Sequence, residues 1–361
     1  MDVPTISDVI NGDGFTQVLQ GSPFADKAER IRSTLREIHH QVLEQRLAGS
    51  RSGPTVDFSI LEETAYYLSG VTITPGRNNT IPPGLQSQML AVAALIFEYL
   101  GDSASQPDES SQLDESNIYY LDACICNTLG LFEANSIAIS RRHLLEQDNF
   151  NSFVKNLSSS LKPNDCLQII YYWLAREIPS IWAQRRGLEN AIQITQSDLA
   201  TALEENRMSR YSYGEMMFWL SLVQGIVLHS RFFQFGKDEY LNSATRHFSH
   251  AINQSRTLNN PPLVWTAFAL QKCGEGMSLN SIWRKLSNIC PEKYLRRLVT
   301  SSPPVLELWS SQIAALEAKL DPTEINESET LEGGILDPRI NRVAISMPTS
   351  AGKTLIAELA I

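Results

Sequence analysis

The stretch Ile31-Arg-Ser-Thr-Leu35-Arg-Glu-Ile38-His-His-Gln-Val42 decides the fold class, because its apolar residues recur at steps of four, three and four. This spacing places the four apolar side chains on one face of an α-helix. Alternating strand patterns are rare before Arg342. Two further sets of apolar residues follow the same helical spacing: Leu279, Ile282, Trp283, Leu286 and Ile289, then Trp309, Ile313, Leu316 and Leu320. We therefore predict a mainly α chain.

Breaks between the expected helices are marked by Gly, Pro, Ser and Asn in five stretches: 49–54, 74–79, 101–116, 259–262 and 301–304. Gly70, Gly101 and Gly130 each close an apolar helical stretch, at spacings of 31 and 29 residues. Glycine just past a helix end suits a left-handed cap, and a period near 30 residues suits stacked helical hairpins.

A second hint of repeats lies further along the chain. Ala244, Phe248 and Ala251 follow the small–aromatic–small spacing of the second helix in a tetratricopeptide-type hairpin. In such hairpins the small residues allow two helices to approach while the aromatic ring fills the gap. These patterns fit two alternative architectures, an irregular helical bundle and tetratricopeptide-like helical hairpins.

Composition and charge limit the classes of function. The 361 residues are 43% hydrophobic and 19% charged, as in soluble globular proteins of two or more domains. The net charge of −10 makes most of the chain a poor nucleic-acid track, because phosphates attract basic surfaces. Three arginine pairs could form a local basic stripe or be solvated helix faces: Arg141-Arg142, Arg185-Arg186 and Arg296-Arg297. No secretory pattern or apolar run of about 18 residues is visible, so we expect a cytoplasmic protein without a membrane partner.

Other chemistry-bearing side chains favour structural roles. The odd and scattered cysteines suit buried reduced thiols better than a zinc site: Cys124, Cys126, Cys166, Cys273 and Cys290. His247 and His250 are three residues apart, but no nearby Cys or acid completes a metal set. Two aromatic runs lie among apolar neighbours and are expected in the core: Tyr171-Tyr172-Trp173 and Phe218-Trp219.

The last segment, 342–361, has a different pattern from the helical stretches and contains the candidate functional motif. Arg342-Val-Ala-Ile-Ser-Met347 suits a buried parallel strand, and Met347-Pro-Thr-Ser-Ala-Gly-Lys-Thr354 follows as a phosphate-binding loop before an apolar helix start at 355–361. Backbone amides of Thr349, Ser350, Ala351 and Gly352 would converge on nucleotide phosphates, and glycine keeps Cβ out of their way. Lys353 would place a positive charge on the β and γ phosphates, and the Thr354 hydroxyl would bind Mg²⁺.

The run 346–361 resembles motif I of the DEAD/DEAH-box superfamily 2 helicases, particularly the superkiller-like group. Met347 stands where the general phosphate-loop pattern has its first glycine, which argues against a generic kinase or GTPase. The resemblance implies a RecA-like domain that binds ATP and Mg²⁺, with Lys353 and Thr354 as catalytic residues. The run Glu307-Leu-Trp-Ser-Ser-Gln312-Ile-Ala-Ala-Leu316 resembles the upstream segment whose glutamine reads the adenine edge, and this implies that Gln312 binds the base.

These observations predict a helical domain over 1–300, which 101–116 could subdivide, and the incomplete start of a RecA-like domain over 301–361. We expect the N-terminal part of an ATP-dependent DNA or RNA helicase, with a protein partner on the helical domain. By analogy, large helicases with such extensions occur in bacterial antiviral defence. Because the sequence stops at Ile361, without the Asp-Glu motif and second RecA-like domain, we expect this piece alone to be inactive. A helical scaffold with a remnant phosphate loop and a signalling ATPase are the alternatives.

Overall fold

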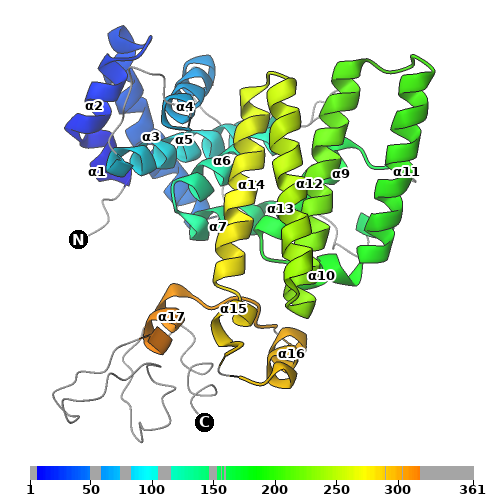
Figure 1. Ribbon diagram of the computed structural model, residues 1–361. Helices are drawn as coiled ribbons and strands as arrows, with labels where there is room; N and C mark the ends of the chain where they lie inside the picture. Colours follow the sequence, from blue (N-terminus) through cyan, green and yellow to red (C-terminus); the bar gives the residue numbers. More distant parts are fainter. Residues whose placement is uncertain are drawn as a thin grey trace, which may run out of the picture. The chain divides into compact units, whose positions relative to one another are not determined.

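The computed structural model describes residues 6–48, 58–73, 83–104, 115–145, 153–155, 157, 160–288, 290–302 and 304–317. Over these residues the chain is mainly α, which confirms the predicted class (Figure 1). The described residues contain no named strand, only one antiparallel bridge between Ser281 and Glu307. The predicted strand at 342–347 lies outside the described residues, as does the rest of 318–361.

The chain divides into two compact units, which we describe separately: Met1–Ser230 with Asn242–Cys273, and Arg231–Leu241 with Gly274–Ile361. The predicted boundary at residue 300 and the subdivision at 101–116 stay predictions. The helices have these bounds: α1 Ile6–Asn11, α2 Asp13–Gln20, η1 Ala25–Lys27, α3 Ala28–Ala48, α4 Phe58–Ile73, α5 Pro83–Ala104, α6 Glu115–Leu129, α7 Glu133–Leu145, α9 Pro163–Leu174, α10 Ile178–Ala183, α11 Arg185–Glu204, α12 Arg210–Phe235, α13 Asp238–Thr257, α14 Pro261–Leu279, α15 Ile282–Leu286, α16 Glu292–Thr300 and α17 Ser310–Glu317.

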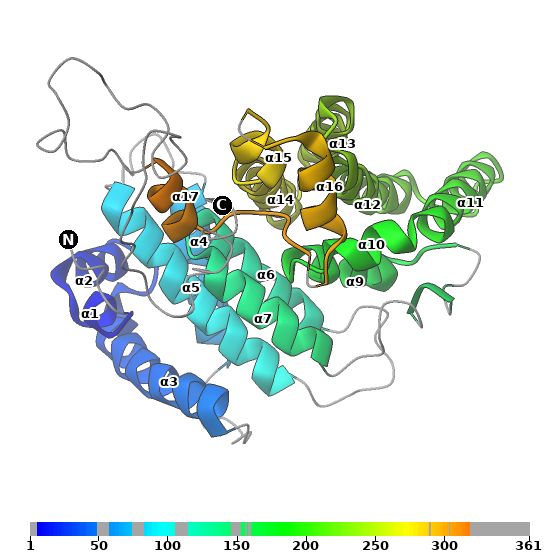
Figure 2. The ribbon, with the colours of Figure 1, turned by 90° about the horizontal axis from the view of Figure 1, so that it is seen from below.

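In the first unit, α5 is the central helix. Every residue from 89 to 101 is buried, because α3, α4 and α6 all pack against α5 (Figure 2). In α3, the four apolar residues with helical spacing are each at most 2% exposed: Ile31, Leu35, Ile38 and Val42. The predicted apolar face of α3 is therefore confirmed.

Aromatic residues fill the core around α9, α12 and α13. Trp173 is fully buried, and its ring centroid lies 5.9 Å from that of Phe248. A Cβ at Gly225 of α12 would come within 2.8 Å of the Phe248 ring, so glycine allows this close approach. Ala244 and Ala251 are buried on the same side of α13 as Phe248. The two aromatic runs predicted to lie in the core, at 171–173 and 218–219, are indeed buried.

The prediction that a glycine lies just past a helix end is confirmed for Gly130, which directly follows α6, and is wrong for the other two glycines. Gly70 and Gly101 lie inside α4 and α5 rather than past their ends. At Gly101 the absence of a side chain instead admits the Tyr120 ring, which a Cβ would meet at 2.9 Å. After α6, the left-handed residue is Leu131, with φ +66°, and not Gly130. The repeating glycines therefore reflect helix packing as well as helix termination.

In the second unit, the helix faces predicted at 279–289 and 309–320 are wrong at Leu279 and at Trp309. Leu279 and Trp309 are 66% and 69% exposed, so neither belongs to the core. The helical pattern breaks because the Ser281 side chain caps a new helix, α15, by accepting a hydrogen bond from the Arg284 backbone N–H. Trp283 is buried, and its Nε1 donates to the Phe233 carbonyl over 2.7 Å. Ile289 and Leu320 lie outside the described residues.

Among the described residues, α12 alone is long and apolar enough by composition to cross a membrane. The most apolar window of this helix is 78% buried within the protein. Such burial is usual for the core helix of a soluble protein, where neighbouring helices cover an apolar surface on every side.

Candidate functional site

Of the predicted nucleotide-binding residues, Gln312 alone lies in the described part of the chain. The six residues of the phosphate loop lie outside it: Thr349, Ser350, Ala351, Gly352, Lys353 and Thr354. Gln312 is the third residue of α17 and is 3% exposed. Its Oε1 accepts a hydrogen bond of 2.8 Å from the backbone N–H of Trp309, as the glutamine of a helix capping box does. Its role in reading adenine stays a prediction.

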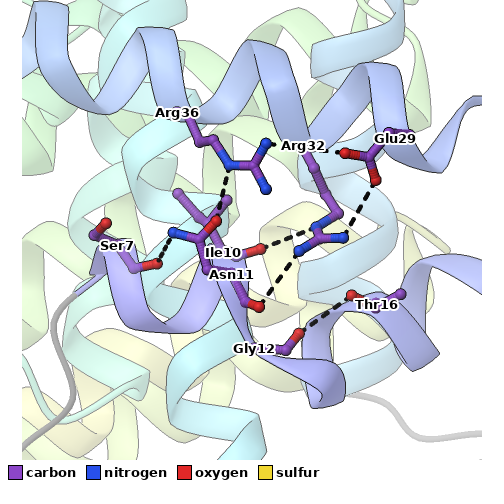
Figure 3. Close-up of polar contacts among 8 residues, drawn as sticks. All are labelled: Ser7, Ile10, Asn11, Gly12, Thr16, Glu29, Arg32 and Arg36. Atoms are coloured by element: carbon purple, nitrogen blue, oxygen red, sulfur yellow. Dashed lines mark hydrogen bonds and ion pairs between the residues drawn. The ribbon is translucent and has the colours of Figure 1, made fainter.

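The most connected polar cluster near the N-terminus joins α1 to α3 (Figure 3). Arg32 donates from Nε to the Ile10 carbonyl over 3.1 Å and from Nη2 to the Asn11 carbonyl over 3.3 Å. Arg36 donates from Nε to the Asn11 side chain over 2.8 Å, while Glu29 accepts from Arg32. Carbonyls at a helix C-terminus carry partial negative charge, so these arginines stabilise the end of α1. Their hydrogen-bonding capacity is used inside the fold.

Polar pairs form a ladder between α4 and α6. Tyr119 donates to Glu62 over 2.9 Å, and Tyr66 donates to Asp122 over 3.0 Å. A third pair joins Ser69 to Cys126, whose Oγ and Sγ are 3.3 Å apart. Residue numbers rise together along both helices, so α4 and α6 run parallel. The ladder shows how two helices separated by α5 in the sequence are held side by side.

The Asp122 carboxyl has the most unusual electrostatics in this ladder. Burial raises its pKa to about 7, although the hydrogen bond from Tyr66 acts in the opposite direction; the Glu62 charge raises it further. Burial also raises the pKa of Tyr66, and the Asp122 charge adds to that effect. Tyr66 therefore stays protonated as a donor, while Asp122 can take up or release a proton near neutral pH.

A second buried charge cluster joins α5, α6 and α7. Glu98 is 1% exposed, and its Oε1 lies 3.1 Å from Nη2 of Arg142. The same nitrogen lies 3.3 Å from Oδ1 of Asp102, which also accepts a 2.6 Å hydrogen bond from Tyr120. Arg142 therefore neutralises acids within the helical core. Arg141 of the same pair donates from Nε to the Ala175 carbonyl over 3.1 Å.

The cysteines and histidines of the described residues lie in structural surroundings. Four cysteines are buried as predicted, whereas Cys290 is only partly buried, and all five are free. Burial raises the pKa of Cys124 and of Cys126 to about 12, so both thiols stay protonated and poorly nucleophilic. In the described part of the chain, no three His, Cys, Asp or Glu residues gather as a metal site. His250 instead contacts the buried Ser221, with Nδ1 3.1 Å from Oγ.

The partners within the two acid clusters could not be predicted from local sequence patterns. The paired residues of the ladder are 56 or 57 positions apart, far beyond any local helical period. Glu98 alone carries a local hint, since it is a charge inside the apolar run 89–100. Comparison with the models of known protein families and with the sequences of curated proteins gave no match.

Proposed function

We propose that this chain is the N-terminal part of an ATP-dependent superfamily 2 helicase or translocase, acting in the cytoplasm. The observation that carries the proposal is Met347-Pro-Thr-Ser-Ala-Gly-Lys-Thr354, with an apolar strand pattern before it and an apolar helix pattern after it. In this proposal Lys353 binds the β and γ phosphates of ATP. Thr354 binds the Mg²⁺ that accompanies them, and Gln312 contributes to the base site.

The helical region is proposed to recruit a protein partner or to regulate the motor. Its supporting feature is the packing of Phe248 on Gly225, a close helix approach of the kind used in tetratricopeptide-like hairpins. The same packing supports the second candidate, a helical-repeat interaction scaffold. The helicase proposal requires that the phosphate loop binds nucleotide, whereas the scaffold proposal does not.

Nucleotide binding by the complete product of the gene that encodes this chain tests the choice. A fluorescent ATP analogue is titrated in the presence and absence of Mg²⁺. We expect Mg²⁺-dependent binding that Lys353→Ala weakens at least tenfold, because the lysine charge on the phosphates is lost. Lys272→Ala, an exposed lysine on α14, is the matched control and should bind as the wild type does. Equal binding by all three proteins would leave the scaffold as the better account.

A further inference from the structure

The three arginine pairs of the sequence have different surroundings in the structure. In the first pair, Arg142 pairs with Glu98 and Asp102, and the exposed Arg141 donates to the Ala175 carbonyl. In the second pair, Arg185 lies 3.5 Å from Glu189 on the next turn of α11. The third pair, Arg296 and Arg297, lies on α16 in the second unit, and both side chains are exposed.

Helix α16 has two sharply different faces. Leu295, Leu298 and Val299 are buried on one face. Lys293, Arg296 and Arg297 are exposed on the other, since residues three and four apart share one side of a helix. The C-terminal end of α16 is held in place, because the backbone N–H of Val305 donates to the Leu298 carbonyl over 3.0 Å. The cations therefore project from an anchored helix.

Two of these cations are not neutralised within the described part of the chain. Arg296 is engaged by Glu292, whose Oε1 accepts hydrogen bonds of 2.8 and 2.6 Å. Among the described residues, no carboxylate pairs with Lys293 or Arg297, which are four residues apart. The nine residues of α16 hold three basic side chains and one acidic one, in a chain whose net charge is −10. A concentration of positive charge on an acidic protein favours a polyanionic partner.

We propose that the exposed face of α16, with Lys293 and Arg297 at its centre, binds the phosphate backbone of a nucleic acid. The choice of nucleic acid among polyanions rests on the proposed helicase function. The ammonium group of Lys293 and the guanidinium fork of Arg297 both suit phosphate oxygens, and their contacts would release condensed counterions. The sequence of the bases would matter little, because such contacts read no base edge.

The test is fluorescence anisotropy of a labelled 20-nucleotide single strand, as DNA and as RNA, titrated at several salt concentrations. The proteins are the complete gene product, its Lys293→Ala/Arg297→Ala variant and a Lys272→Ala/Arg246→Ala control that removes two exposed cations from other helices. Loss of two phosphate contacts should lower the slope of log affinity against log salt by about 1.4. At about 0.1 M salt the affinity should fall roughly 10- to 30-fold. The control should match the wild type.

Several outcomes would overturn the inference: no binding of either strand by the wild type, equal binding by the α16 variant, or equal losses in the variant and the control. Preferential binding to vesicles containing phosphatidylserine, with no effect on the oligonucleotide, would also overturn it. Circular dichroism establishes that each variant is folded. A Lys353→Ala arm separates the two proposals, since it should abolish ATP turnover and leave oligonucleotide affinity intact. If the wild-type protein binds the oligonucleotide but does not hydrolyse ATP, only the proposed helicase function is contradicted.

Discussion

Tyr66 on α4 donates a hydrogen bond of 3.0 Å to the buried carboxyl of Asp122 on α6, a partner 56 positions away in the sequence. The ring of Phe97 on α5 lies against Tyr66, with the centroids 5.0 Å apart. Three helices therefore meet at one titratable group. Glu62 lies on the same side and makes a negative charge on Asp122 less favourable.

The first prediction concerns the pH dependence of stability. The pKa of Asp122 is raised from 3.8 to about 7 in the folded protein, so its stabilising contribution is complete below about pH 4 and is lost as the pH rises towards 7. Asp122→Asn cannot ionise but can still accept from Tyr66. Between pH 5 and pH 8 the wild type should lose roughly 2–3 kcal/mol more unfolding free energy than the variant. Urea unfolding at each pH measures the difference. Parallel pH profiles would contradict this assignment.

The second prediction concerns Gly236 at the end of α12. Its φ is +68°, and a Cβ there would lie 2.5 Å from the Trp283 ring. Gly236→Ala should lower the unfolding free energy of the second unit by about 2 kcal/mol or more, because the backbone and the ring must both adjust. Tryptophan fluorescence during denaturation, compared between the wild type and the variant, measures the change. An unaltered midpoint would show that neither constraint matters.

The third prediction concerns Leu131, where introducing a glycine, instead of removing one, should relieve backbone strain. Leu131 is 82% exposed and has φ +66°, a conformation that costs a residue with a Cβ roughly 1 kcal/mol. Leu131→Gly should therefore stabilise the first unit by about 0.5–1 kcal/mol in spite of the greater flexibility of glycine. The denaturation midpoint measures it, with Leu131→Ala as the control that keeps the strain. A midpoint lower than that of the alanine variant would refute the strain argument.

The fourth prediction concerns the charge cluster around Arg142. Arg142→Met should cost roughly 3 kcal/mol, because it removes a cation that faces the buried Glu98 and the half-buried Asp102. Arg141→Met removes a single hydrogen bond to a carbonyl and should cost about 1 kcal/mol. Adding Glu98→Gln to Arg142→Met should recover part of the loss. Equal costs for the two arginine variants would argue against a buried ion pair.

The sequence predicts helices well where the apolar period is regular and uninterrupted, as at Ile31 to Val42. It predicts poorly where a cap resets the period. Ser281 begins a new helix, so Leu279 no longer shares a face with Trp283. The left-handed ending of α6 at Leu131, where the Phe132 N–H donates to the Asn127 carbonyl over 2.7 Å, is equally hard to predict, because left-handed residues are usually glycine or asparagine.

The candidate functional residues also divide into those that a local sequence pattern predicts and those that it does not. A phosphate loop can be proposed from the sequence alone because every residue that it would need lies within eight consecutive positions, from Met347 to Thr354, although these lie outside the described residues. The buried acids are not predictable, because their partners come from other helices. For Gln312, the sequence pattern predicts a base contact, and the structure shows that its side chain accepts a hydrogen bond from the Trp309 backbone.

The most direct test of the helicase proposal is ATP hydrolysis by the complete gene product, measured with and without single-stranded DNA or RNA. The proposal predicts turnover that nucleic acid stimulates and that Lys353→Ala abolishes, while Lys272→Ala retains it. Absence of nucleic-acid-stimulated turnover in the folded wild-type protein would contradict the proposal, as would full activity of Lys353→Ala.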